Sequence, residues 1–286
     1  MTNKNKQISI LGCGWLGLPL AKSLVEKGFL IKGSTTTLEK ISILENVGIQ
    51  AYQIEVGEIE IKGEINSFLE NSEILIIDIP PKLRNVSSEN FVKKIQNLIP
   101  FIEKASIEKV IFISSTSVYA DLPLDCTSSS LSINSGDKNL ITENTISNPD
   151  TKNGKQLVQV ENLLQSNTNF KTTVIRFGGL IGEMRHPVHF LSGRKNLENP
   201  NAPINLIHQT DCIGIIQEII KQNCWNETFN AVTPFHPTRK QYYTQKTIEL
   251  NLPLPEFEEG KISIGKTISS DKVTAILGYK FQNTTL

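Results

Sequence analysis

The chain has 286 residues, in which 29 Lys and Arg balance 29 Asp and Glu, so its formal net charge is zero. This balance argues against nucleic acid as a partner, because proteins that bind it usually show a clustered basic excess. No uncharged apolar run approaches the roughly 18 to 20 residues of a membrane span, and the length suits two lobes or one large α/β domain.

The N-terminal part of the chain alternates between β- and α-type patterns. Residues 7–11 are rich in β-branched side chains, which predicts a strand, and residues 16–26 carry leucines at helical spacing and close on Gly28. The alternation continues with strands at 29–32, 51–56, 73–79 and 109–114 and helices at 38–47, 65–69 and 89–105, the last interrupted by Pro100. The apolar run at 73–79 is typical of a strand buried on both faces. This order predicts an α/β fold with a Rossmann-type, doubly wound parallel sheet.

The pattern changes after Tyr119. Residues 121–150 are dominated by Ser, Asn, Asp and Thr and lack periodicity, so we expect a surface excursion there. A helix is predicted around 157–164 and a strand at 172–177, and the elements beyond about residue 180 are shorter. We therefore predict a Rossmann domain over residues 1–180 and a smaller α+β substrate lobe over residues 181–286.

The turn after the first predicted strand reads Gly12-Cys-Gly-Trp-Leu-Gly17 and matches G-x-G-x-x-G. The first glycine permits the tight turn, the second lets a pyrophosphate approach the backbone, and the third lets helix and strand pack closely. The phosphates then face the free N–H groups of the following helix, so a chain without net charge can hold a dinucleotide. The alternative is a glycine turn with a purely structural role. The predicted cofactor residues are Gly12, Gly14, Trp15, Leu16 and Gly17.

The end of the second predicted strand bears on the choice between NAD and NADP. Proteins that prefer NAD commonly carry an acidic residue about 20 residues past the glycines, where it binds the ribose 2′-hydroxyl. This chain has no carboxylate there and has Lys40 one turn further, so the pattern favours NADP slightly over NAD. The alternative is that Thr36 and Glu39 form a capping box without any ligand. The residues assigned to the cofactor are Thr35, Thr36 and Thr37.

Ile79, Pro80 and Pro81 end the fourth predicted strand, at the carboxyl edge where ligands of such sheets bind. We assign all three to the cofactor site. The alternative is that the two prolines simply stop the strand.

Three further motifs follow in order. They are Ser114-Ser-Thr-Ser-Val-Tyr119, Arg176-Phe-Gly-Gly-Leu-Ile-Gly182 and Asn205-Leu-Ile-His-Gln-Thr-Asp211. Together with the glycine motif they resemble the extended short-chain dehydrogenase/reductases, which include sugar-nucleotide epimerases and dehydratases. The resemblance runs from about residue 7 to the C-terminus. It implies a Rossmann fold and a nicotinamide dinucleotide cofactor.

The resemblance also implies roles for single residues. In such enzymes a Ser or Thr four residues before the Tyr of this stretch hydrogen-bonds the reacting oxygen, which makes Ser115 the candidate catalytic residue and Tyr119 structural or substrate-side. Ser114 and Gly178 are placed with the cofactor. Arginine suits bidentate recognition of phosphate or carboxylate, so an anionic substrate is expected, with surface salt bridges as the alternative. The candidate substrate residues are Thr116, Arg176, Arg185 and His208, the last with a structural role as its alternative.

The catalytic pair of this family does not stand at the expected place. Its tyrosine and lysine occur as Y-x-x-x-K at the start of the next helix, where the lysine lowers a phenol pKa that is otherwise about 10. Here Asn153 and Leu157 occupy the two positions, which resembles the atypical branch that keeps the nucleotide site and loses the pair. Lys155 is assigned to the cofactor, with a solvated lysine as the alternative. The literal match at Tyr242 lies in the second lobe and is not expected to be catalytic.

No metal site is expected. The cysteines lie far apart, without a C-x-x-C pair, and His186 and His189 have no acidic or cysteine companion nearby. Reduced thiols indicate a cytoplasmic protein. The cysteines are Cys13, Cys126, Cys212 and Cys224.

These features predict an NAD(P)-binding protein that acts as an oxidoreductase or epimerase on a small polar or sugar-derived substrate. Ser115 would polarise a carbonyl, and water or a residue of the second lobe would replace the missing acid. The alternative is a non-catalytic dinucleotide-binding protein whose nucleotide occupancy changes how it meets a partner.

Overall fold

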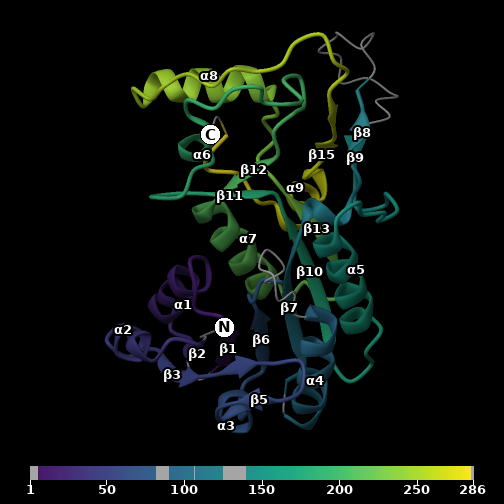
Figure 1. The fold of residues 1–286 in the computed structure, drawn as a ribbon. Coiled ribbons are helices and arrows are strands. Elements are labelled where there is room, and N and C mark those ends of the chain that lie inside the picture. Colours follow the sequence, from purple (N-terminus) through teal and green to yellow (C-terminus); the bar gives the residue numbers. More distant parts are fainter. Residues whose placement is uncertain (1–5, 82–89, 106, 125–139, 285–286) are drawn as a thin grey trace.

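The computed structural model describes residues 6–81, 90–105, 107–124 and 140–284, so Cys126 and the middle of the predicted excursion lie outside the described residues. A seven-stranded sheet forms the centre (Figure 1), and every neighbouring pair in it is parallel. In spatial order its strands are β13 (Thr228–Ala231), β10 (Lys171–Phe177), β7 (Lys109–Ser115), β6 (Ile74–Ile77), β1 (Gln7–Leu11), β2 (Leu30–Thr35) and β3 (Gln50–Gln53). The predicted doubly wound parallel sheet is confirmed.

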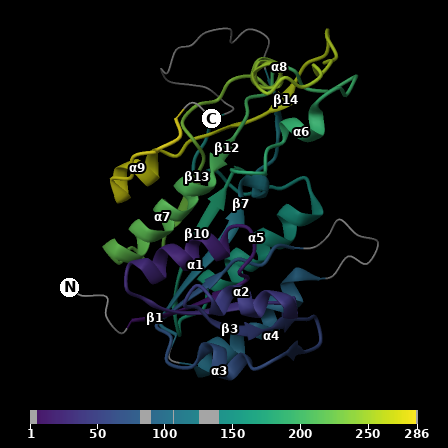
Figure 2. The same ribbon diagram turned by 90° about the vertical axis from the view of Figure 1, so that its left-hand side faces the viewer.

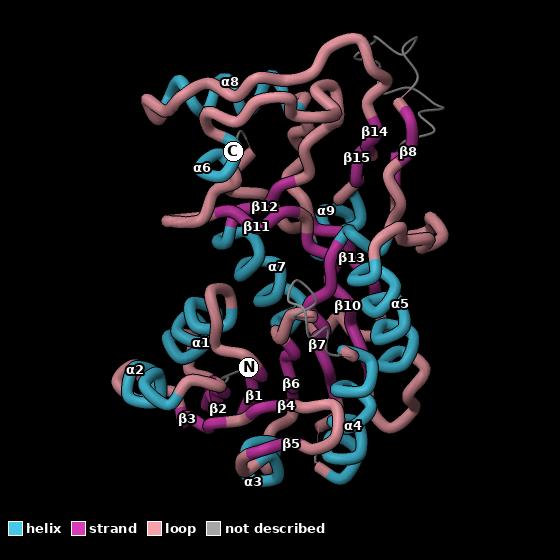
Figure 3. The backbone as a smooth tube through the Cα atoms, in the orientation of Figure 1, coloured by secondary structure: helices cyan, strands magenta, loops and turns pink. Residues whose placement is uncertain are grey.

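Helices cover both faces of this sheet (Figures 2 and 3). One face packs against α1 (Gly17–Glu26), α2 (Ile41–Glu45), α7 (Gln209–Gln222) and α9 (Asp271–Leu277). The other packs against α3 (Ile65–Leu69), α4 (Phe91–Lys104) and α5 (Lys152–Gln165). Ile76 of β6 joins the first core and its neighbour Ile77 joins the second, as alternate side chains of a doubly covered strand must.

The helix α4 runs through Pro100, so the predicted interruption there is wrong. Asn90 caps its start by accepting a hydrogen bond of 3.1 Å from the Lys93 N–H. Pro100 lies on the exposed side of the helix, where water can bond the carbonyl that loses its donor. The buried stripe continues on the opposite side of α4 through Phe91, Ile95, Leu98 and Ile102.

Two predicted elements are divided in the structure. The helix expected at 38–47 is a short 3₁₀ helix, η1 (Leu38–Lys40), followed by α2. The strand expected at 51–56 is split into β3 and β4 (Glu55–Val56), and β4 pairs antiparallel with β5 (Ile61–Lys62). This hairpin brings β4 to the carboxyl edge of the sheet.

A smaller unit stands above the carboxyl edge (Figure 1). It holds the parallel pair β11 (Gly179–Ile181) and β12 (Leu206–His208) and the helices α6 (Val188–Leu191) and α8 (Arg239–Glu249). Its own core contains Ile181, Val188, Ile204, Leu206, Tyr242 and Tyr243.

The division of the chain at residue 180 stays a prediction, but elements beyond that residue contribute to the sheet layer. The edge strand β13 and the covering helices α7 and α9 all come from the C-terminal part. The excursion also pairs with late segments, β8 (Leu122–Pro123) with β14 (Ile264–Gly265) and β9 (Leu140–Ile141) with β15 (Thr267–Ile268). Within the described residues, none of the helices combines the length and apolarity needed to cross a bilayer.

Candidate functional site

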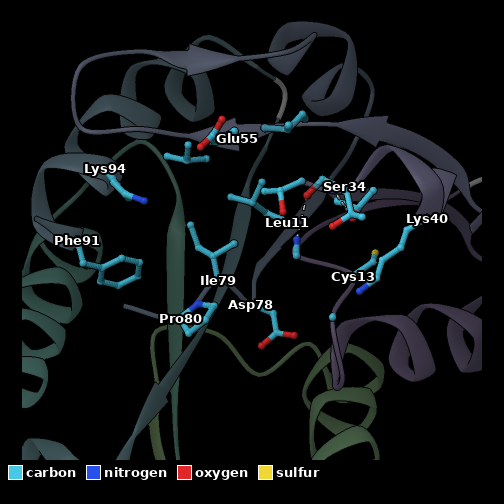
Figure 4. Close-up of a pocket in the computed structure, with 17 residues that line it drawn as sticks. Leu11, Cys13, Ser34, Lys40, Glu55, Asp78, Ile79, Pro80, Phe91 and Lys94 are labelled. Atoms are coloured by element: carbon cyan, nitrogen blue, oxygen red, sulfur yellow. Dashed lines mark hydrogen bonds between the residues drawn. The ribbon is translucent and has the colours of Figure 1, made fainter. Parts of the chain in front are cut away.

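A pocket opens at the carboxyl edge of the sheet, where the strand order reverses between β1 and β6 (Figure 4). Ligands of doubly wound sheets bind at this switch point. Figure 4 shows Phe91 and Lys94 on one side, Lys40 and Cys13 on the opposite side, and Glu55 between them. The lining residues are Leu11, Gly12, Cys13, Gly14, Ser34, Thr35, Thr36, Thr37, Lys40, Ile54, Glu55, Val56, Asp78, Ile79, Pro80, Phe91 and Lys94.

The three glycines of the turn have different surroundings. A Cβ on Gly12, which has φ of +106°, would lie 2.5 Å from the Asp78 carbonyl oxygen. A Cβ on Gly17 would lie 2.2 Å from the Gly12 carbonyl oxygen, so packing alone requires both glycines. Gly14 has no atom within 4 Å of its Cβ position. The turn therefore presents bare backbone to open space at its second glycine.

Hydrogen-bond donors lie beside that open space. The N–H groups of Trp15 and Leu16, just before α1, donate to no acceptor among the described residues. Such unpaired donors are the usual property of a helix start, where the helix dipole also favours negative charge. Bare backbone and free donors together form a cradle for an oxyanion.

Asp78, directly after β6, lies against the glycine turn, with Oδ2 3.1 Å from the Cβ position of Gly17, and it is not among the predicted site residues. Burial raises the pKa of its carboxyl to about 7, although the Gly17 N–H that donates to it and the positive charge of Arg185 both oppose the rise. The available signal was an acidic residue at the end of an otherwise apolar strand.

Cys13, between the first two glycines, lines the pocket with an uncharged thiol. Burial, with the negative charge of Asp78 as a second cause, raises the pKa of its thiol to about 12. The thiol is therefore protonated at neutral pH and is a poor nucleophile.

The end of β2 contributes hydroxyl groups to the pocket. Ser34 Oγ accepts a hydrogen bond of 2.9 Å from the Gly12 N–H, which ties β2 to the glycine turn. Thr35 Oγ1 accepts one of 3.1 Å from the Thr37 N–H. The capping box considered as the alternative for Thr36 is not formed, because the N-cap of η1 is Thr37 and no side chain caps the helix. Thr36 therefore lines the pocket without serving as a cap.

Part of the pocket wall was not predicted. Glu55 follows β3 in the chain and reaches the pocket through the hairpin of β4, and Phe91 and Lys94 come from the first turns of α4. Of the residues predicted after β6, Ile79 and Pro80 line the pocket and Pro81 does not. A carboxylate at a strand end was the available signal for Glu55, whereas α4 is placed only by tertiary packing.

The last two residues of β7, Ser114 and Ser115, and the next residue, Thr116, have different surroundings. Ser115, the candidate catalytic residue, is partly exposed at the strand end, and its Oγ accepts a hydrogen bond of 3.2 Å from the Ser117 N–H. Ser114 is buried and donates to Glu161 of α5 at 2.5 Å. Thr116 begins the 3₁₀ helix η2 (Thr116–Val118) and is also buried. Of the three, Ser115 is the most open to a ligand.

Arg176 of β10 lies inside the molecule and is held by protein groups. Its guanidinium pairs with Glu161, with a closest distance of 2.6 Å, and donates to the Tyr119 hydroxyl, also at 2.6 Å. Tyr119 in turn bonds Asn230 Oδ1 of β13 at 2.9 Å. This polar network, defined by Ser114, Glu161, Arg176, Tyr119 and Asn230, joins three neighbouring strands to α5.

The start of α5 carries no tyrosine. Asn153 is partly exposed, whereas Leu157, one turn later, is only 4% exposed and belongs to the core between α5 and the sheet. Lys155 is exposed and does not line the pocket. Its assignment to the cofactor stays a prediction.

Two further predicted residues, His208 and Gly178, have structural contacts. His208 is the N-cap of α7, and its Nδ1 accepts from the Thr210 N–H at 3.3 Å. A Cβ on Gly178 would lie 2.5 Å from the Asn205 carbonyl oxygen, so close packing requires that glycine. Neither residue lines the pocket, and both assignments stay predictions.

The literal Y-x-x-x-K match lies on α8. Tyr242 is buried, and its hydroxyl lies 2.8 Å from Nε2 of His186. Burial lowers the pKa of His186 to about 4, and its Nδ1 accepts from the Val188 N–H, so this imidazole is neutral at pH 7. Tyr242 belongs to the core of the second unit, and neither Tyr242 nor His186 lines the pocket.

The chain was compared with protein families, with curated proteins and with solved structures. No family model matches the chain. Protein YeeZ of Escherichia coli strain K12 is 29% identical over 282 residues, covering 97% of this chain and 96% of its own.

Two solved structures resemble the whole chain. One is a short-chain dehydrogenase/reductase superfamily protein from Agrobacterium tumefaciens with bound NAD (TM-score 0.75, 14% identity, covering 96% of this chain and 92% of its own). The other is UDP-glucuronic acid 4-epimerase from Bacillus cereus in complex with NAD (TM-score 0.74, 14% identity, covering 96% and 91%). The chain therefore has the Rossmann-type fold of the short-chain dehydrogenase/reductases and NAD-dependent epimerase/dehydratases.

Proposed function

We propose that this chain binds a nicotinamide dinucleotide with its diphosphate on the glycine turn. The observation that carries the proposal is the open space over Gly14, flanked by the unpaired N–H groups of Trp15 and Leu16. A diphosphate needs close approach to the backbone and several N–H donors, and both are present here. A structural turn alone would not require the space over Gly14 to stay open.

The adenosine half would occupy the pocket between the glycine turn and α4. Ile54, Val56 and Ile79 offer apolar walls for a base, and the Glu55 carboxylate is an acceptor for its exocyclic amine. Thr36 and Lys40 stand where β2 ends and offer a hydroxyl and a positive charge to a ribose 2′-phosphate. These two residues support the preference for NADP over NAD.

The proposed activity is that of an oxidoreductase or epimerase on a small polar or sugar-derived substrate. The bound nicotinamide would supply hydride transfer. Ser115, partly exposed at the end of β7, would donate a hydrogen bond to the reacting oxygen of the substrate, since its Oγ accepts from the Ser117 N–H and keeps its own proton for a ligand. The proton donor would be water or a group of the second unit.

A non-catalytic dinucleotide-binding protein is the second candidate, and one observation favours it. The two positions expected for the catalytic pair hold Asn153 and the buried Leu157, and Tyr119 is engaged with Arg176 and Asn230. Burial also raises the pKa of Tyr119, which keeps its phenol neutral. No phenol on α5 is then available for proton transfer.

Titration with NADPH and NADH by calorimetry tests the binding proposal. We expect both to bind, NADPH more tightly, and Gly14→Ala to weaken both at least about tenfold because its methyl group occupies the phosphate cradle. The melting temperature of Gly14→Ala should stay close to that of the wild type, since its Cβ meets no atom. Absence of binding to the wild-type chain would refute the proposal.

Nicotinamide absorbance, followed with UDP-glucuronic acid and small carbonyl compounds, then separates the two candidates. Turnover that Ser115→Ala abolishes without weakening NADPH binding supports the enzyme. Tight NADPH binding without turnover of any of these compounds favours the non-catalytic protein.

A further inference from the structure

The second unit touches the glycine turn through a tight hairpin. Gly182 and Arg185 exchange two backbone hydrogen bonds of 3.0 Å each, so that only Glu183 and Met184 form the tip. Met184 has a φ of +58° and is fully exposed. The hairpin follows β11, which lies above α1 in Figure 1.

Trp15, within the glycine turn, is the point of contact. A Cβ on Gly182 would lie 2.9 Å from Cζ2 of the indole, so the hairpin backbone rests directly on the ring. Gln209, the first residue of α7, donates from Nε2 to the Trp15 carbonyl oxygen at 2.6 Å. These contacts hold the second unit against the glycine turn at Trp15, whose own N–H is one of the two unpaired donors.

Arg185 completes this contact and keeps its hydrogen-bonding capacity. Its guanidinium carbon lies 4.6 Å from the centroid of the Trp15 ring, in a cation–π arrangement. Stacking uses the face of the guanidinium and leaves its five N–H donors free at the edge. The side chain is exposed and forms no salt bridge among the described residues, although its charge acts on the Asp78 carboxyl and opposes the rise of that pKa. An arginine held by stacking, with its donors unused, is prepared for an oxyanion.

We propose that Arg185 binds a phosphate group lying on the glycine turn, so that the second unit contributes a residue to the dinucleotide site. The inference rests on the proposed function, because the nearest phosphate would be the diphosphate of the cofactor. The turn offers N–H groups from Trp15 and Leu16, and Arg185 offers charge from its position over the Trp15 ring. A phosphate carried by a substrate would present the same chemistry, and the experiment separates the two sources.

Trp15 serves as the reporter. The chain has two tryptophans, and Trp225 lies elsewhere, beneath Lys109 at the start of β7. In a Trp225→Phe background, ADP-ribose, which has the diphosphate without the nicotinamide, should change the fluorescence of Trp15. We expect Arg185→Met to weaken ADP-ribose at least about tenfold and Arg185→Lys less, since lysine retains only the charge. Adenosine, which lacks phosphate, should bind all variants equally.

Arg194→Met is the matched control, because Arg194 is another exposed arginine of the second unit that does not contact the turn. A second arm titrates UDP-glucuronic acid into protein saturated with NADH. A tenfold loss for Arg185→Met in the first arm assigns the phosphate to the cofactor, and a loss confined to the second arm assigns it to the substrate. Equal affinities in both arms overturn the inference. If the wild-type chain binds neither ADP-ribose nor NADH, the proposed function itself fails.

Discussion

Asp78, beside the glycine turn, is a buried carboxyl with a raised pKa. Its carboxyl accepts the Gly17 N–H at the start of α1 and faces the charge of Arg185. Burial outweighs both and raises the pKa to about 7, against about 3.9 in an unfolded chain. At a pH between these two values, the folded protein therefore keeps a proton on Asp78 that the unfolded chain has released.

This difference predicts how stability depends on pH. Between about pH 4 and pH 7 the native state binds more protons than the unfolded state, so the contribution of Asp78 to the free energy of unfolding falls as the pH rises. Asp78→Asn keeps a neutral acceptor for Gly17 and removes this loss. We expect the variant to match the wild type near pH 4 and to be more stable above pH 7.

Urea denaturation of both proteins at a series of pH values measures the difference directly. Comparison of the two proteins cancels the titration of other groups. A difference in the free energy of unfolding that stays constant from pH 4 to pH 8 would contradict the assignment.

At the scale of elements, the polar network links three neighbouring strands, and one of them, β7, ends at the candidate catalytic residue Ser115. Arg176 of β10 lies in register with Ser114 of β7 and with Asn230 of β13, and all three point toward α5. Asn230 Nδ2 is buried with no hydrogen-bond partner among the described residues, so the network is not fully satisfied. Such a network specifies the positions of α5 and η2 beside Ser115 at a cost in desolvation.

We therefore expect Glu161→Leu to lower the free energy of unfolding by about 3 to 5 kcal/mol, because it leaves the charge of Arg176 buried and unpaired. The double variant Glu161→Leu/Arg176→Met should lose less than the sum of the two single changes. A double-mutant cycle by urea denaturation measures this coupling. Additive losses would show that the two side chains do not stabilise each other.

At the scale of the whole molecule, the C-terminal part returns to complete the first unit. Asp211 in the first turn of α7 accepts from the Tyr279 hydroxyl at 2.9 Å and from the Gln282 N–H at 2.7 Å. Leu277 and Tyr279 enter the core beneath the sheet. Two of the four helices on this face of the sheet, α7 and α9, therefore come from the C-terminal part of the chain.

This topology predicts that residues 1–180 do not fold alone. The fragment lacks β13, α7 and α9 and exposes the apolar face that they cover. We expect a urea profile by circular dichroism without the cooperative transition of the full chain. A steep, reversible transition in the fragment would show instead that residues 1–180 form an independent domain.

The sequence by itself determined the order of strands and helices, the doubly wound sheet and the glycine turn. These rest on local properties, namely the period of apolar residues and the freedom of Gly12, which neighbours in the chain reveal. It also located much of the pocket, since the ends of parallel strands must meet at one edge.

Only the tertiary structure decided which side chains meet at that edge. It enclosed Arg176 with Glu161, brought Glu55 and Lys94 into the pocket, and placed Arg185 on Trp15. These contacts join residues far apart in the chain, as Gln209 and Trp15 are, 194 positions apart. Because packing and burial fix such contacts, no local pattern in the sequence encodes them.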